Sequence, residues 1–151
     1  VPSMGRIATT RQIQAPVEQV FDVVAHVENF QQAVPEIVGI EYLSETHKGV
    51  GTRFQETRRM GKREVTCALE VTEYEAGEHV RIVSDAGGTV WDTVFRVKAN
   101  DGGTELTMAM DDRPYKLLAK LFTPLIRGMV RKAVEKDMDA VKAFCEADPV
   151  V

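Results

Sequence analysis

The hydrophobic positions of the chain follow two periods, and the change between them separates helical from extended segments. Residues 6–15 alternate between two faces, with Arg11 and Ile13 on the same one, which predicts a strand. Apolar residues then recur at helical spacing over residues 17–24, and a second short helix is expected over residues 28–33. The order therefore begins with one strand and two short helices.

From about residue 37 the hydrophobic period changes to two, and turn signals recur at hairpin spacing. Glycine-containing turns separate six candidate strands along this part of the chain. In the last of them Leu106, Met108 and Met110 share one face, while Glu105 and Thr107 lie on the other. One apolar and one polar face are typical of an antiparallel sheet that is covered on one side.

A long helix is expected over residues 115–147, and Pro124 predicts a kink or a restart in it because proline removes a backbone donor. At about 100° per residue, one side of this helix is apolar, and Asp137 lies within that side. Met138 projects toward the charged side and is expected to take no part in a pocket. The apolar side comprises Leu118, Phe122, Ile126, Met129, Val130, Ala133, Val141 and Phe144.

This order of elements predicts an α+β fold, in which a curved seven-stranded antiparallel sheet wraps around the long C-terminal helix. One helix is too narrow to cover such a sheet closely, so a concave, mostly apolar gap is expected between them, which is the usual form of a small-molecule site. No linker or repeat divides the chain, and we interpret residues 4–148 as a single domain. Residues 1–3 precede Met4 and are interpreted as a cloning remnant.

Composition narrows the class of function. The 151 residues are 44% hydrophobic and 28% charged, with a net charge of -4, so a packed core is expected and general nucleic-acid binding is not. No apolar run approaches the ~20 residues that cross a bilayer, and no signal peptide is expected. Cys67 and Cys145 are far apart in sequence and are interpreted as free thiols of a cytoplasmic protein.

Several segments follow one another in a characteristic order over nearly the whole chain: IQAPVEQVFDVV (13–24), NFQQAVPEI (29–37), GVGTRF (49–54), VTEYEAGEHV (71–80), GGTELTM (102–108), PLIRGMV (124–130) and AVKAF (140–144). Together they resemble the helix-grip fold of the START and polyketide cyclase/dehydrase (SRPBCC) superfamily. The second segment is also similar to the coenzyme-Q-binding branch. The resemblance implies an internal cavity for a sterol, lipid, polyketide, quinone or hormone, and catalysis in only some members.

The carboxylate of Asp137 is the main candidate for chemistry. On a face that borders a cavity it would be partly desolvated, so it should become neutral or find a cationic partner. Strand alternation offers Glu56, Arg58 and Arg11 as neighbours. Such a cluster could orient a ligand oxygen or move a proton. Alternatively, Asp137 lies at the rim of the cavity or in a structural ion pair. Both interpretations stay open.

Other residues are candidates for contact with a ligand. Tyr42 and Trp91 either stack on a flat ring or pack in the core, and the methionines either adapt to a ligand or fill gaps. The full set of ligand-binding candidates is Arg11, Tyr42, Phe54, Cys67, Leu69, Trp91, Thr93, Phe95, Met108, Met110, Phe122, Ile126, Met129, Val130 and Ala133.

No spacing of His, Cys, Asp or Glu resembles a metal site, and no cofactor is expected. Arg58, Arg59, Lys62 and Arg63 surround one predicted turn and either contact an anionic membrane or form a solvated hairpin tip. A homodimer is compatible with the sequence. We expect a binder of a hydrophobic or aromatic small molecule; the alternatives are a polyketide cyclase, aromatase or dehydratase, and a protein-interaction module.

Overall fold

The computed structural model of the chain describes residues 5–147, so the interpretation of residues 1–3 falls outside the described part. Its elements, in chain order, are β1 (Gly5–Ile13), α1 (Val17–Ala25), α2 (Val27–Ala33), β2 (Ile37–Tyr42), β3 (Arg53–Met60), β4 (Arg63–Glu75), β5 (His79–Ala86), β6 (Thr89–Asn100), β7 (Gly103–Pro114) and α3 (Leu117–Glu146).

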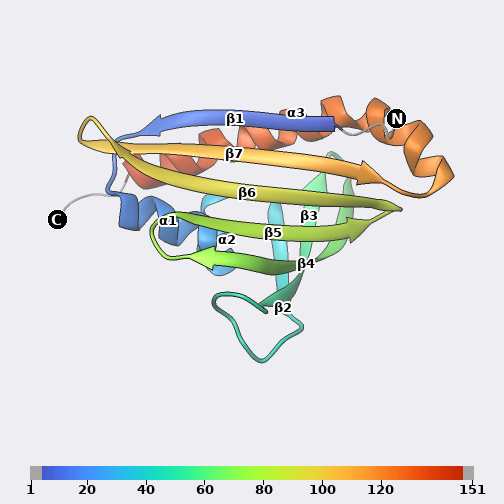
Figure 1. Cartoon of the computed structure of the whole chain (residues 1–151), viewed down its shortest axis with the longest axis horizontal. Helices are drawn as coiled ribbons and strands as arrows, with labels where there is room; N and C mark the ends of the chain where they lie inside the picture. The colour runs from blue at the N-terminus through green and yellow to red at the C-terminus, as the bar shows by residue number, and fades with distance from the viewer. Residues whose placement is uncertain (1–4, 148–151) are drawn as a thin grey trace.

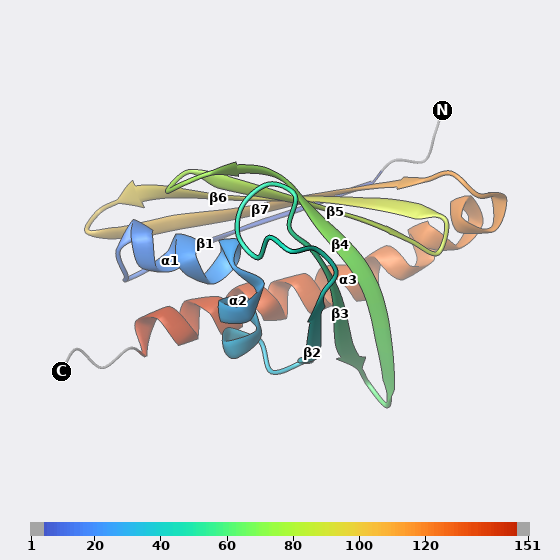
Figure 2. The same cartoon turned by 90° about the horizontal axis from the view of Figure 1, so that it is seen from below.

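The seven strands form one antiparallel sheet in the order β1-β7-β6-β5-β4-β3-β2 (Figure 1). Strand β1 pairs with β7, the last strand, so the N-terminal segment lies at one edge of the sheet and β2 at the other. Figure 2 shows the sheet curling over α3, with α1 and α2 on the same side as the long helix. The predicted α+β helix-grip architecture is therefore confirmed.

Two-residue turns connect the long strands of the sheet and fix the register in which they pair. Asn100 pairs with Gly103, so the β6–β7 loop has only two residues, Asp101 and Gly102, and both have positive φ angles of 46° and 79°. This is the backbone of a type I′ turn, which matches the twist of the adjoining strands and favours Asp-Gly. The Gly87-Gly88 turn between β5 and β6 has the same character, with φ angles of 64° and 84°.

The core lies between the concave face of the sheet, α1 and the second half of α3. Leu106 and Met108 of β7 are buried in the same hydrophobic cluster as Val20 and Phe21 of α1. The second half of α3 contributes Val134, Met138, Val141 and Cys145, which are spaced by three or four residues and therefore share one helical face. The expectation that Met138 projects away from the core is wrong, because it is 1% exposed.

The first half of α3 is oriented differently from the prediction. The helix continues through Pro124 without a restart, although Figure 1 shows its first turns set at an angle to the rest. Thr123 meets Thr89 through their hydroxyl groups at 2.8 Å, and both residues are buried. Four residues later, Arg127 forms two hydrogen bonds of 2.8 Å with Asp112, whose side chain is 1% exposed.

These polar contacts turn the apolar side of the first half of α3 to the outside. The expectation that Leu118, Phe122, Ile126 and Met129 face the sheet is wrong, since they are 69%, 51%, 40% and 58% exposed. Gly5 of β1 lies beneath the guanidinium of Arg127, where any Cβ would overlap it. Glycine at that position leaves room for the guanidinium that pairs with Asp112.

Candidate ligand-binding cavity

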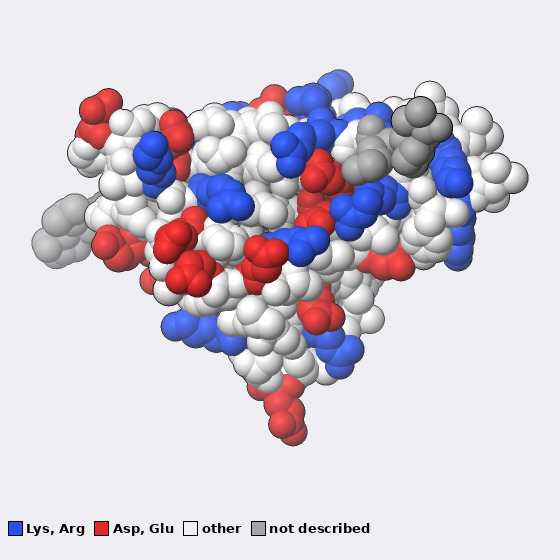
Figure 3. All heavy atoms as spheres, viewed as in Figure 1, with Lys and Arg blue, Asp and Glu red and all other residues white. Residues whose placement is uncertain are grey.

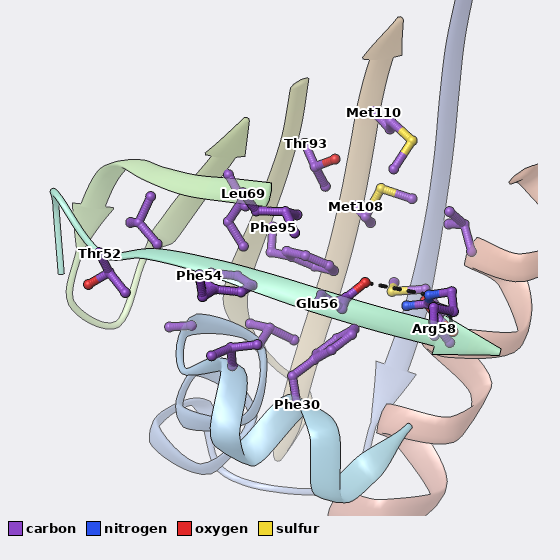
Figure 4. A pocket seen from close by; sticks show the side chains of 18 of the residues that line it. Phe30, Thr52, Phe54, Glu56, Arg58, Leu69, Thr93, Phe95, Met108 and Met110 are labelled. Carbon is purple, nitrogen blue, oxygen red and sulfur yellow. Dashed lines mark hydrogen bonds and ion pairs between the residues drawn. The ribbon is translucent and has the colours of Figure 1, made fainter. Parts of the chain in front are cut away.

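A cavity of about 140 Å³ lies between the concave face of the sheet, helices α1 and α2, the β2–β3 loop and the second half of α3 (Figure 4). An apolar cavity of roughly 150 Å³ is large enough to bind a molecule of the size of benzene. Its wall is mostly apolar and includes Phe30, Phe54, Leu69, Ile82, Phe95, Met108, Met110, Val134 and Met138.

Nine residues that the sequence singled out lie in this lining. Six were predicted to contact a ligand, and three were predicted to carry chemistry. The first group is Phe54, Leu69, Thr93, Phe95, Met108 and Met110, and the second is Glu56, Arg58 and Asp137. They come from β3, β4, β6, β7 and α3, which the curvature of the sheet brings around one space.

The three ionisable residues form one cluster on the cavity wall. Glu56 and Arg58 are two residues apart on β3 and therefore point to the same side. Arg58 Nη1 donates a hydrogen bond of 2.9 Å to Asp137 Oδ1, and Arg58 Nε lies 3.6 Å from Glu56 Oε2. The side chains are 17%, 17% and 15% exposed for Glu56, Arg58 and Asp137, so the cluster is shielded from most solvent.

Burial changes the acid–base properties of this cluster. Desolvation raises the pKa of Glu56 and of Asp137, and the positive charge of Arg58 opposes this rise in both. Burial by itself would lower the pKa of Arg58, but the two carboxylates outweigh it and raise that pKa instead. A carboxyl group with a raised pKa is able to donate a hydrogen bond or a proton, and the guanidinium is able to hold an oxygen that carries negative charge.

Arg11 lies outside the cavity, although it does point toward α3. Its guanidinium pairs with Glu135 at 3.0 Å and with Asp139 at 2.7 Å. Of the two arginines that the sequence offered as partners of Asp137 or Glu56, Arg58 is therefore the one observed. The alternative with Arg11 is wrong, because Glu135 and Asp139 hold its guanidinium. Arg11 instead ties β1 to the charged side of α3.

Neither Tyr42 nor Trp91 lines the cavity. Tyr42 stacks on His47, with ring centroids 3.7 Å apart, in a separate polar hollow that Asp22, His26 and Glu28 also line. Burial, together with Glu28, raises the pKa of Tyr42 to about 12. Trp91 lies near the start of β6, opposite Asp112 in the register of the β6–β7 pair, and it is half-buried.

The remaining candidates are also outside the lining. Cys67 lies opposite Glu56 in the β3–β4 register but does not reach the cavity surface. The exposed Phe122, Ile126 and Met129 and the half-buried Val130 and Ala133 belong to the part of α3 that does not border it. Both cysteines carry free thiols.

Sequence reasoning missed part of the lining. Val24, Ala25, Val27 and Phe30 of α1 and α2 close one side of the cavity, and Phe30 meets Phe95 with centroids 5.9 Å apart. The two short helices were expected to close one end of the fold, but the sequence did not show which of their side chains face the cavity. His47, Gly49 and Thr52 of the β2–β3 loop complete this side.

Two classes of site are not found in the described part of the chain. Among residues 5–147, no group of three or more His, Cys, Asp or Glu side chains is placed to hold a metal ion. Within the same range, no helix combines the length and the apolar character needed to cross a bilayer.

Solved structures of several proteins have the same fold as this chain. The Zhui aromatase/cyclase from Streptomyces sp. R1128 superposes with a TM-score of 0.79 at 16% identity, over 95% of this chain and 94% of that one. TTHA0849 from Thermus thermophilus superposes with a TM-score of 0.74 at 17% identity, over 91% and 94% of the two chains. Ara h 8.0201 superposes with a TM-score of 0.74 at 12% identity, over 95% and 98%.

No curated protein matches the chain. A family does match, however, over residues 4–146, which include every described helix and strand. This family is described as polyketide cyclase / dehydrase and lipid transport. Since the match extends over almost all of the 151 residues, the chain belongs to the polyketide cyclase/dehydrase and lipid transport family.

Proposed function

We propose that this protein binds a hydrophobic, ring-bearing small molecule of the polyketide, quinone or lipid type in its cavity. The observation that supports this most is the distribution of polarity in the lining. One wall carries Glu56, Arg58 and Asp137, and most of the remaining surface is aromatic, aliphatic or thioether. Apolar pockets with a few convergent polar groups are the usual form of small-molecule sites.

The two kinds of surface have different roles in binding. Burial of the ligand's apolar surface supplies affinity, at about 25 cal/mol for each Å² removed from water. Phe30 and Phe95 offer tilted ring faces, and Met108 and Met110 offer polarisable sulfur atoms that adapt to a flat ring (Figure 4). Arg58 or a protonated Glu56 donates a hydrogen bond to a carbonyl or hydroxyl oxygen and so sets the orientation.

The size of the cavity bears on the choice of ligand. A volume of about 140 Å³ corresponds to one six-membered ring with short substituents, and a second ring would reach toward the open side of the cavity. A longer chain would have to extend out of the cavity through its open side. A ring inside and a tail outside would suit a quinone or a partly cyclised polyketide.

Filling the cavity with a larger side chain is expected to weaken ligand binding. Thr93 lies on β6 with its side chain in the cavity, and Val94 is the next residue, pointing to the opposite face. We expect Thr93→Phe to weaken binding of 2-naphthol by about tenfold or more, because the added ring takes up the space in which a ligand ring would be buried. Isothermal titration calorimetry would measure this.

The matched control is Val94→Phe, which adds the same group outside the cavity and should bind 2-naphthol as the unmodified protein does. Native mass spectrometry of freshly purified protein would show any small molecule that is retained. Equal binding by the two variants, together with no retained molecule, would contradict the proposal.

Catalysis of cyclisation or dehydration in the same cavity is the second candidate. It is favoured by the raised pKa values of Glu56 and Asp137, and the structural similarity to proteins named as aromatase/cyclases is consistent with it. A carboxylate would remove a proton next to a carbonyl group, and Arg58 would stabilise the resulting enolate oxygen. The apolar wall would hold a flexible substrate in a folded shape.

Asp137→Leu separates catalysis from simple binding. If Asp137 transfers a proton, turnover of an aromatic polyketide precursor should fall by about 100-fold or more, the usual effect of losing a general acid or base. Asp139→Leu, which removes an exposed carboxylate from the same helix, is the control. Unchanged ligand binding, unchanged turnover and equal or higher stability in Asp137→Leu would leave Asp137 with no functional role.

A further inference from the structure

The first half of α3 has an inverted distribution of polarity. Its inner side consists of Ala119, Thr123 and Arg127, four residues apart, and the latter two make the polar contacts with Thr89 and Asp112. Its outer side consists of Leu117, Leu118, Leu121, Phe122, Leu125 and Met129, which we call the outer apolar face. These six side chains are 82%, 69%, 64%, 51%, 75% and 58% exposed.

The outer apolar face is continuous. At about 100° per residue its six members occupy an arc of roughly 140°, almost opposite to Ala119, Thr123 and Arg127. Scattered single apolar residues are normal on a protein surface, but a contiguous apolar surface of this kind marks a site of interaction. In Figure 3 the right-hand end of the molecule, where the first turns of α3 lie in Figure 1, shows uncharged surface beside Lys or Arg side chains.

Charge around this face indicates the kind of partner. Residues 113–134 contain six Lys or Arg side chains and no Asp or Glu. Two of the six, Arg113 and Arg127, pair with Asp92 and Asp112. The other four, Lys116, Lys120, Arg131 and Lys132, are exposed. The protein as a whole has a net charge of -4, so this concentration of positive charge is local.

We propose that the outer apolar face docks on the surface of an anionic lipid bilayer, with α3 lying in the plane of the interface. Leucine, phenylalanine and methionine would enter the boundary between headgroups and acyl chains, and the flanking lysine and arginine side chains would extend to the lipid phosphates. A helix with a wide apolar arc and basic flanks is typical of interfacial helices.

Alternative occupants fit the face less well. In a symmetric dimer built on it, the same surface of both copies would meet, and Lys116, Lys120, Arg131 and Lys132 of one copy would approach the same cations of the other. The face is also convex, since it is the outer side of a single helix. A fluid lipid surface covers a convex helix without the preformed groove that a protein partner would need.

Vesicle sedimentation with the full chain tests this proposal. We expect binding to vesicles of phosphatidylcholine and phosphatidylglycerol at low salt, and binding weaker by about tenfold or more for pure phosphatidylcholine or at 0.5 M NaCl, because salt screens the basic flank. Leu121→Gln/Leu125→Gln should reduce binding by about tenfold or more, since two side chains that enter the bilayer are lost. Both positions are exposed, so folding should be retained.

Two matched controls locate the contact. Val38→Gln/Leu43→Gln changes two exposed apolar residues elsewhere and should bind vesicles like the unmodified protein. Lys116→Ala/Lys120→Ala should weaken binding, whereas Lys62→Ala/Arg63→Ala removes the same charge from the β3–β4 turn and should not. Loss of binding only in the variant of the β3–β4 turn would overturn the proposal in favour of that hairpin.

Two further results would also overturn it: no binding to the anionic vesicles at low salt, or unchanged binding by Leu121→Gln/Leu125→Gln. Sedimentation equilibrium adds another outcome. A dimer that this double variant converts to monomers, without vesicle binding, would assign the face to contact between copies of the chain. The vesicle test needs no ligand, so its result is independent of what the cavity binds.

Discussion

Arg58→Met is expected to lower the free energy of unfolding by about 3–5 kcal/mol at pH 7, the usual loss when one partner of a buried ion pair is removed. Arg58 is the cation that lies between Glu56 and Asp137, at 3.6 Å and 2.9 Å, and each of the three side chains is at most 17% exposed. Methionine has nearly the same length but no charge. Two partly desolvated carboxylates would then remain without a cationic partner.

The loss should depend on pH in a defined direction. Burial already raises the pKa of both carboxyl groups in the folded protein, and removal of Arg58 removes the charge that opposes the rise. A group with a raised folded pKa contributes stability that is present below its unfolded pKa, about 4, and is lost as the pH rises through the folded value. The difference between Arg58→Met and the unmodified protein should therefore be small near pH 4 and large at pH 8.

Urea unfolding at several pH values measures this difference. Arg59→Met is the control, since Arg59 is the next residue on β3 but is exposed, and it should change stability by no more than about 0.5 kcal/mol. Adding Glu56→Gln and Asp137→Asn to Arg58→Met should restore part of the loss at pH 8. An equal loss at pH 4 and pH 8 would mean that Arg58 contributes through packing and not through its charge.

Arg127→Met should have an effect of similar size, about 3–5 kcal/mol, since Asp112 would be left as a buried carboxylate without its partner. Asp112 is 1% exposed, and both of its oxygens accept hydrogen bonds of 2.8 Å from Arg127. The same pair holds the first half of α3 to β7. We therefore also expect Arg127→Met to speed up hydrogen exchange of the amides in residues 120–128, relative to the unmodified protein. Exchange in residues 134–145 should change much less.

Arg131→Met is the matched control, because Arg131 lies one turn further along α3 and is exposed. It should leave both the unfolding free energy and the exchange rates nearly unchanged. Unaltered protection of residues 120–128 in Arg127→Met would show that Thr123, Ala119 and the helix backbone are sufficient to hold this segment.

The two ion pairs have different consequences for function. The cluster of Arg58 borders the cavity and is a candidate for contact with a ligand, whereas the pair of Arg127 and Asp112 determines which side of α3 faces the solvent. Arg58→Met is thus expected to affect both stability and ligand binding. Arg127→Met should alter the presentation of the outer apolar face while leaving the lining of the cavity in place.

Much of the fold could be predicted from local patterns. The alternation of Leu106, Met108 and Met110 identifies the covered face of β7, and Asp101-Gly102 marks a hairpin turn, because strand period and turn chemistry depend only on residues that are close in sequence. The pairing of Arg58 with Asp137 was one of the alternatives that the patterns left open, and strand alternation placed Glu56 beside Arg58.

Local patterns did not predict which side of the first half of α3 faces the sheet. A hydrophobic stripe predicts which side of a helix is buried only if apolar burial decides the packing. In the first half of α3, contacts between Arg127 and Asp112 and between Thr123 and Thr89 decide it instead. These partners belong to different elements, and their proximity exists only after the sheet has formed. Periodicity is a local property, whereas the choice between two faces of a helix depends on which distant side chains it meets.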